Sequence, residues 1–163
     1  MTASRSWCGR RPNPESSGAD EVNIQTFTVG AFQENSYLVV DDRTYRAVMI
    51  DPGGEGDKLV DAIENSAAKL EAIWITHAHV DHVGGIASIK RRWDVPIYLH
   101  PLDRRLYEAA SRQAEVYGIP FEEPPPPDRE FADGQVLKLG EIVDRGDVGA
   151  QEAERRITDQ LSV

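Results

Sequence analysis

The chain has 163 residues, a length that suits one domain able to bury about 70% of its unfolded surface. It carries 18 Lys and Arg against 28 Asp and Glu, so its formal net charge is −10. This acidic balance argues against nucleic acid as a partner and against binding to an anionic membrane, because both are bound through clustered basic residues. Hydrophobic residues make up 40% of the chain, which excludes wholesale disorder. No apolar run is long enough for a membrane span.

The first 21 residues are rich in Ser, Arg, Pro and Gly, and they lack the apolar stretch of a secretory signal. We expect a disordered leader over residues 1–21, with an organelle transit peptide as a weaker alternative. The single cysteine, Cys8, excludes an intrachain disulfide and is typical of a reducing compartment. The sequence therefore predicts a cytoplasmic protein.

The ordered region is expected to begin near Val22 with three strands in succession. These strands are predicted over residues 22–30, 35–42 and 44–54, and the first of them alternates apolar and polar side chains. Asp41 and Asp42 supply a tight turn between the second and the third. Three consecutive strands predict an antiparallel meander.

The remainder alternates between helix and strand patterns. Leu59, Ile63 and Ala67 recur at four-residue intervals, which predicts a helix over residues 56–69 with one apolar face. The further elements expected are a strand over 70–76, a helix over 82–93, a strand over 95–100, a longer helix over 101–118, a polyproline-type loop at 124–127 and a strand over 135–142. Pro101 suits the first turn of the longer helix, and Gly118 suits the position just past its end. This order predicts an α/β fold with helices covering a sheet.

The residues that carry chemistry are concentrated where the strand predicted over residues 70–76 leads into the helix predicted over residues 82–93. Three of the four histidines, His77, His79 and His82, fall within six residues, together with Asp81. His77 and His79 are two apart, so in extended backbone they face the same way. Asp81 and His82 begin the next helix, for which Asp81 would be a natural N-cap. Neutral imidazoles and a carboxylate are good ligands for zinc, iron or manganese, and this arrangement suits two adjacent metals that activate water.

The pattern His-x-His-x-Asp-His after a strand resembles the metallo-β-lactamase-fold hydrolases. The flanking segments AFQENSYLV at residues 31–39 and IDPGG at residues 50–54 look like the hydroxyacylglutathione hydrolase (glyoxalase II-like) branch. The resemblance covers about residues 22–142. It implies an αβ/βα sandwich, of which this chain would hold only the N-terminal half.

The resemblance also implies roles for individual residues. His77 and His79 would bind one metal, and Asp81 and His82 a second, with up to two Zn²⁺ ions and with iron or manganese as alternatives. Asp81 would also orient the attacking hydroxide. Asp51 would hold a ligand histidine from behind. As the first residue of the turn Asp-Pro-Gly-Gly, Asp51 also has a purely structural reading, and both stay open.

The later part of the chain departs from the family pattern. It has no histidine after His100 and no segment of the His-Thr-Pro-Gly-His type, where the family has further ligands. Beyond residue 142 we expect no apolar strand, so residues 143–163 are interpreted as a tail foreign to the family. A truncated or frameshifted product is the favoured explanation, and a divergent member with a helical cap is the alternative. His100 could replace a missing ligand, but a surface or capping role is favoured.

The function implied by the resemblance is a metal-dependent hydrolase that uses a metal-activated water, with a small-molecule thioester as substrate. Because the later ligands are missing, we expect weakened metal binding and doubtful activity. The alternatives are a non-catalytic, pseudo-enzyme metal-binding module and a mononuclear-iron enzyme resembling sulfur dioxygenases. The apolar face that the missing half would cover is expected to favour self-association.

Overall fold

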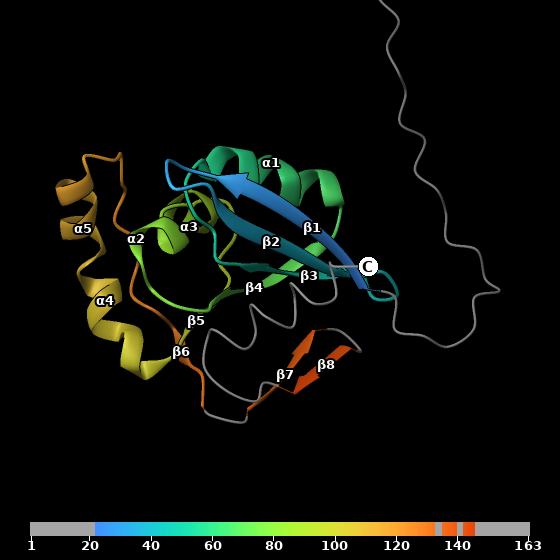
Figure 1. The fold of residues 1–163 in the computed structure, drawn as a ribbon. Helices are drawn as coiled ribbons and strands as arrows, with labels where there is room; N and C mark the ends of the chain where they lie inside the picture. The colour runs from blue at the N-terminus through green and yellow to red at the C-terminus, as the bar shows by residue number, and fades with distance from the viewer. Residues whose placement is uncertain (1–21, 133–134, 140–141, 146–163) are drawn as a thin grey trace, which may run out of the picture.

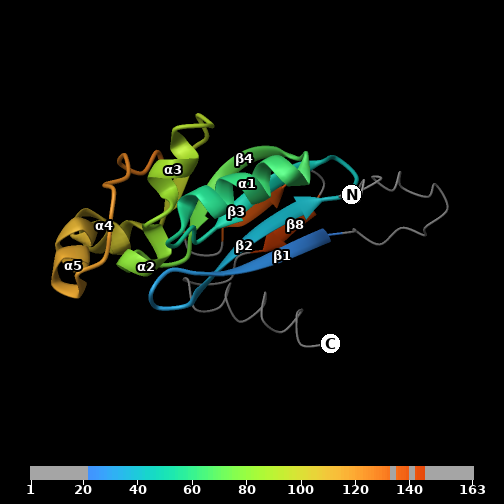
Figure 2. The same ribbon diagram turned by 90° about the horizontal axis from the view of Figure 1, so that it is seen from above.

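The computed structural model describes residues 22–132, 135–139 and 142–145 (Figure 1). The predicted leader and nearly all of the predicted tail lie outside these residues, and the domain boundaries stay predictions. The described part is a six-stranded sheet with helices α1 and α3 over one face and a two-stranded ribbon on the other side (Figures 1 and 2). None of the helices in this part of the chain has the length and apolarity to cross a membrane.

The predicted antiparallel meander is confirmed. Its strands are β1 (Val22–Val29), β2 (Glu34–Asp41) and β3 (Arg46–Ile50), and both neighbouring pairs run antiparallel. The turn after β2 is closed by Asp41, whose carboxylate accepts hydrogen bonds from the backbone N–H groups of Arg43 and Thr44. An aspartate that bonds to the backbone two residues ahead favours this kind of tight turn, as the sequence predicted.

The second half of the sheet is parallel. Strands β4 (Lys69–Ile75), β5 (Ile97–Leu99) and β6 (Arg129–Glu130) follow β3 in the order β1-β2-β3-β4-β5-β6. Helix α1 (Gly56–Ser66) connects β3 to β4. Because parallel strands end at the same edge of a sheet, the residues after β3 and β4 are brought together there. The antiparallel β2 begins at that edge.

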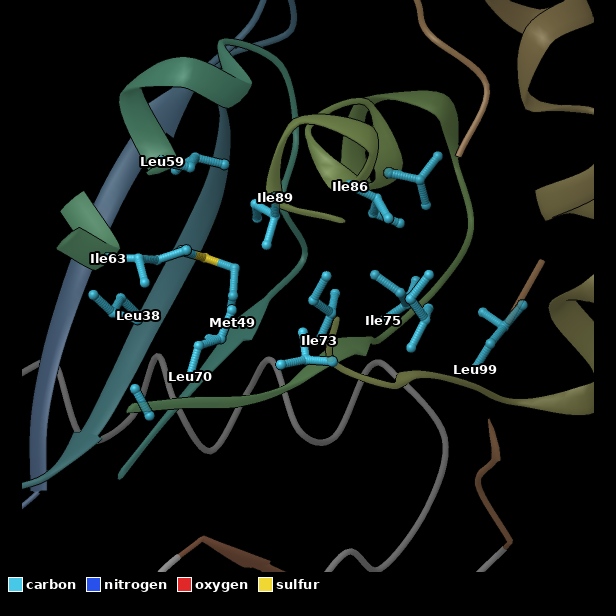
Figure 3. Packing of buried hydrophobic residues seen from close by; sticks show 14 of the residues in the cluster. Leu38, Met49, Leu59, Ile63, Leu70, Ile73, Ile75, Ile86, Ile89 and Leu99 are labelled. Carbon is cyan, nitrogen blue, oxygen red and sulfur yellow. The ribbon is translucent and has the colours of Figure 1, made fainter. Parts of the chain in front are cut away.

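The core lies between the sheet and its covering helices (Figure 3). Leu59 and Ile63 from α1 are buried there, as their spacing predicted, while Ala67 ends the helix in a left-handed conformation. They pack with apolar side chains of β2, β3 and β4 and of helix α3 (Ile86–Lys90), among them Leu38, Met49, Leu70, Ile73, Ile75, Ile86 and Ile89. Burial of this many aliphatic side chains fixes α1 and α3 on one face of the sheet.

The helix predicted over residues 82–93 is wrong in its bounds, because the segment forms two short helices. Helix α2 (Val80–Val83) and α3 are separated by Gly84 and Gly85. The backbone N–H of Gly85 donates to the carbonyl of Pro52 at 2.8 Å, and a Cβ on Gly85 would lie 2.6 Å from the carbonyl oxygen of Gly53. This close contact with another loop interrupts the helix and leaves no space for a side chain.

The longer predicted helix is also divided. It consists of a 3₁₀ turn, η1 (Pro101–Asp103), then α4 (Arg104–Glu108) and α5 (Ala110–Tyr117). Between the two α-helices, the side-chain amide of Gln113 donates at 3.1 Å to the carbonyl of Leu106, which also accepts from the backbone N–H of Ala109. Gly118 ends α5 with φ 66°, as predicted.

The strand predicted over residues 135–142 is two strands, β7 (Val136–Leu139) and β8 (Ile142–Arg145), which pair antiparallel. The expectation of no strand beyond residue 142 is therefore wrong. The side chain of Leu139 is buried among Tyr37, Val48 and Ile50, on the second face of the large sheet. The ribbon thus covers part of the apolar face that the sequence analysis expected to be exposed.

Candidate metal centre

The candidate centre lies at the sheet edge where β3 and β4 end. Asp51 directly follows β3, and Thr76 and His77 directly follow β4. Glu34 is the first residue of β2, and His82 lies in α2. Four separate elements therefore deliver polar side chains to one place.

Asp51 is held from two sides. Its side chain is buried, and its Oδ1 accepts a hydrogen bond from the backbone N–H of Thr76 at 2.7 Å, while its Oδ2 accepts one from the Thr76 hydroxyl. The Ser36 hydroxyl donates to the backbone carbonyl of Asp51 at 2.7 Å. Asp51 has φ 46°, a left-handed conformation that aspartate tolerates better than most residues. These contacts fix the direction of the carboxylate.

His82 is buried, with two carboxylates facing one of its nitrogens. Its Nδ1 lies 3.2 Å from Oδ2 of Asp51 and 3.5 Å from Oε1 of Glu34. On the other side of the ring, its Nε2 lies 3.8 Å from Oδ2 of Asp81. The ring thus stands between two buried acids behind it and the more exposed Asp81 in front.

Of the other two histidines of the motif, His77 lies next to His82, and His79 lies next to His77. The ring centroids of His77 and His82 are 3.8 Å apart, and those of His77 and His79 are 4.8 Å apart with the rings edge to face. Nδ1 of His77 lies 3.1 Å from the Thr76 hydroxyl. His79 is exposed. The side-chain ligand atoms of Asp51, His77 and His82 all lie within 4.8 Å of one another, a grouping that could hold a metal ion.

The helix cap predicted for Asp81 is wrong. The N-cap of α2 is His79, and the backbone N–H of His82 donates to the carbonyl of His79 at 2.9 Å. Asp81 lies in the first helical turn with its side chain partly exposed. Its carboxylate is therefore directed at the site and not consumed in capping the helix.

The donor set fits a divalent ion of the kind predicted. Imidazole and carboxylate groups suit zinc, iron and manganese alike. The two buried carboxylates of Asp51 and Glu34 also face the same imidazole, so acidic side chains surround a potential metal ligand. A divalent cation is attracted to such a cluster. The assignment of His77 with His79 to one ion, and of Asp81 with His82 to another, stays a prediction.

Glu34 is the residue that the sequence analysis missed. It lies within the segment AFQENSYLV that carried the family resemblance, but a single acidic residue in a strand forms no motif that would predict a functional role. The available signal was a charged residue at the start of a strand whose other residues are largely apolar. His100, in contrast, has the capping role that was favoured, because its Nδ1 accepts a hydrogen bond from the backbone N–H of Leu102 at 3.3 Å.

A groove of about 510 Å³ lies directly beside Asp81. Its walls come from the β1–β2 loop, the start of α1, helix α2 and the segment after α5, and they include Phe32, Val80, Ile119 and Phe121. The ring of Phe32 packs edge to face on Tyr117, with centroids 5.1 Å apart. The groove is lined mainly by apolar atoms and backbone.

Comparison with known proteins places this centre in a family. Residues 29–151 match the family model described as the metallo-β-lactamase superfamily. The chain belongs to this superfamily. Hydroxyacylglutathione hydrolase GloC of Haemophilus influenzae is 38% identical over 120 residues, which are 72% of this chain and 56% of that protein. The probable metallo-hydrolase YqgX of Bacillus subtilis is 37% identical over 83 residues, 51% of this chain and 38% of that protein.

Solved structures agree with this assignment. The protein TTHA1623 in a di-iron-bound form superposes with a TM-score of 0.65 at 41% identity, over 70% of this chain and 57% of that one. The B3 metallo-β-lactamase BLEG-1 superposes with a TM-score of 0.65 at 27% identity, over 74% of this chain and 58% of that one. The predicted family and α/β class are thus confirmed. The chain spans just over half the length of these two proteins and of GloC, and so corresponds to part of the family's fold.

Proposed function

We propose that this chain is a metal-dependent hydrolase that splits a thioester with water. The observation that carries the proposal is the convergence of His77, His82 and Asp81 at the sheet edge. The buried Asp51 lies behind His82 and faces its Nδ1. The similarity to a hydroxyacylglutathione hydrolase supports the thioester as the substrate class.

The metal would be held by imidazoles of the motif together with Asp81, while Asp51 stays bonded to Thr76 behind His82. A bound divalent ion supplies Lewis acidity, which makes water more acidic and polarises a carbonyl oxygen. Zinc and iron both satisfy the donor set, and the di-iron form of TTHA1623 favours testing iron first.

Asp81 is suited to act as the general base. Its carboxylate is partly exposed and lies at the open side of His82, so water and substrate can reach it. It accepts the proton of the attacking water as the water oxygen adds to the thioester carbonyl carbon. The carbon–sulfur bond then breaks, and the thiolate leaves and takes up a proton. The apolar groove beside Asp81 offers a place for the acyl group of the substrate.

The test is metal analysis of the purified protein, followed by hydrolysis of S-lactoylglutathione by the zinc-loaded and iron-loaded forms. We expect bound metal and thioester hydrolysis, with H77A losing metal and D81N losing activity by a factor of at least about 100. H100N is the matched control, because asparagine keeps an acceptor for the Leu102 N–H and His100 lies outside the cluster. A metal-loaded chain that hydrolyses no thioester would support the non-catalytic alternative instead.

A further inference from the structure

The start of β2 holds an acidic side chain that neither the motif nor the family resemblance assigns a role. The side chain of Glu34 is only 4% exposed, although it lies at the end of a hairpin opposite Val29. Its Oε2 lies 3.4 Å from the Ser36 hydroxyl, whose proton goes to the Asp51 carbonyl at 2.7 Å. Its Oε1 faces Nδ1 of His82 at 3.5 Å. Burial of a carboxylate costs several kcal/mol unless other groups compensate it, so this placement needs a physical reason.

Space for the Glu34 carboxylate is provided by Gly53. A Cβ at position 53 would lie 2.4 Å from Oε2 of Glu34 and 2.4 Å from the backbone carbonyl oxygen of Asp81. Any other residue at this position would push the carboxylate away from His82. The loop after β3 is therefore shaped so that the acid from β2 reaches the histidine of α2.

The arrangement around His82 is asymmetric. Asp51 and Glu34 both face Nδ1, at 3.2 and 3.5 Å and without the alignment of a hydrogen bond, whereas Nε2 lies 3.8 Å from Asp81. Two carboxylates attract the single ring proton of a neutral imidazole to the nitrogen that they face. The opposite nitrogen then carries the lone pair, and a metal binds through that lone pair.

We propose that Glu34 is a positioning residue, which acts with Asp51 to hold the His82 proton on Nδ1 and to keep Nε2 directed at the metal. The inference rests on the proposed function for the presence of a metal at Nε2. It assigns to Glu34 the placement of His82 and also a share of the negative charge that favours a cation. Asp51 is itself held by Thr76, so the two acids support the ring from two different strands.

The first experiment measures zinc affinity by competition with a chelating dye. The E34Q variant keeps the shape of the side chain and removes its charge, and we expect about tenfold weaker zinc binding. E34D, which keeps the charge, is expected to bind more tightly than E34Q. E64Q is the matched control, because Glu64 pairs with Arg92 on the surface, and its zinc affinity should equal that of the unaltered chain. Equal affinities of E34Q and E64Q would overturn the proposal.

The second experiment needs no metal. Long-range ¹H–¹⁵N NMR spectra of the metal-free protein at alkaline pH report which nitrogen of His82 carries the proton. We expect the proton on Nδ1 in the unaltered chain, a mixture of both forms in E34Q, and mostly the other form in the double variant E34Q/D51N. An unchanged proton position in all variants would refute the role of Glu34. A chain with the expected spectra but no zinc binding would refute the proposed function and leave the role of Glu34 intact.

Discussion

Thr76 connects the end of β4 to the buried carboxylate after β3. Both its backbone N–H and its hydroxyl donate to Asp51, so one residue satisfies both oxygens of that side chain. Asp51 is almost fully buried, and a buried carboxylate that loses a donor retains the cost of its desolvation. The neighbouring His77 begins the metal motif, so the same strand end supports both sides of the site.

Replacement of Thr76 tests this connection. We expect T76V to lower the free energy of unfolding by about 1–3 kcal/mol, because the hydroxyl donor is lost while the side-chain shape is kept. Urea unfolding of the metal-free protein measures the change. T76S keeps the hydroxyl and should lose much less of the free energy of unfolding. Equal decreases in this free energy for T76V and T76S would show that the Asp51 contact is not the cause.

Gly53 and Gly84 form a natural pair for a second test. A Cβ at Gly53 would meet Glu34 and Asp81 at 2.4 Å, whereas one at Gly84 would find its nearest atoms at 3.5 Å. We expect G53A to be destabilised by about 1–3 kcal/mol through overcrowding. G84A, where the backbone is in the ordinary helical region, should be close to neutral in the same denaturation experiment. A neutral G53A would contradict the close contact.

The sequence was sufficient to locate the histidine motif, because three imidazoles within six residues form a local pattern. It was not sufficient to find Glu34, because its contact with His82 joins residues 48 positions apart and depends on the pairing of β2 with β3. The helix cap assigned to Asp81 failed for a related reason. Helix α2 begins at Val80 with His79 as its N-cap, and a single local rule could not decide between His79 and Asp81.

At the scale of elements, a side chain of α4 forms a hydrogen bond to the proline-rich segment. The hydroxyl of the buried Tyr107 donates to the carbonyl of Pro125 at 2.7 Å. Burial raises the pKa of Tyr107 above its ordinary value of 10.0, and the charge of Asp128 raises it further. The polyproline-type loop predicted at residues 124–127 is therefore anchored to a helix, although it contains no regular structure of its own.

This contact predicts a pH dependence of stability. Because the pKa of Tyr107 is higher in the folded than in the unfolded protein, the folded state binds the phenolic proton more tightly. The stabilising contribution is complete below pH of about 10 and falls as the pH rises further. Urea unfolding between neutral pH and about pH 11 should therefore show a steeper loss for the unaltered chain than for Y107F. Parallel curves for the two proteins would exclude Tyr107 as the cause.

The element pattern was largely predictable, but the breaks within helices were not. The apolar spacing of Leu59 and Ile63 identified α1, alternation identified β1, and short runs with strand character identified β2 and β3. The interruption at Gly84 and Gly85 follows from a hydrogen bond to Pro52, more than 30 residues earlier in the chain. Apolar periodicity predicts which face of a helix is buried. It does not predict which distant loop will contact that helix.

At the scale of the whole molecule, a bound ion is expected to stabilise the folded chain. The ligand atoms come from separate elements that meet only in the folded state, so metal binds the folded chain better than the unfolded one. At a free zinc concentration about 100 times the dissociation constant, the gain is about 2.7 kcal/mol.

Thermal denaturation with and without zinc measures this gain. The unaltered chain and H100N should both show a higher melting temperature with zinc, and a chelator should abolish the increase. H82A should show no increase at the same concentrations. A shift of equal size in H82A would place the bound metal elsewhere.

The family and the α/β class could be anticipated because the motif, the meander and the strand–helix alternation are all readable along the chain. The covering of the second face of the sheet by the β7–β8 ribbon could not be anticipated, because the ribbon lies in a part of the sequence without strong alternation. Leu139 reaches Tyr37, Val48 and Ile50 from about 100 residues away. Self-association through the remaining apolar surface stays a prediction.

All side chains of the candidate centre come from residues 34–82, in β2, β3, β4 and α2 and the loops between them. Because synthesis runs from the N-terminus, all of these residues are incorporated before β5 and the later helices. The side chains of the centre are therefore all present in the nascent chain before strand β5 exists to pair with β4.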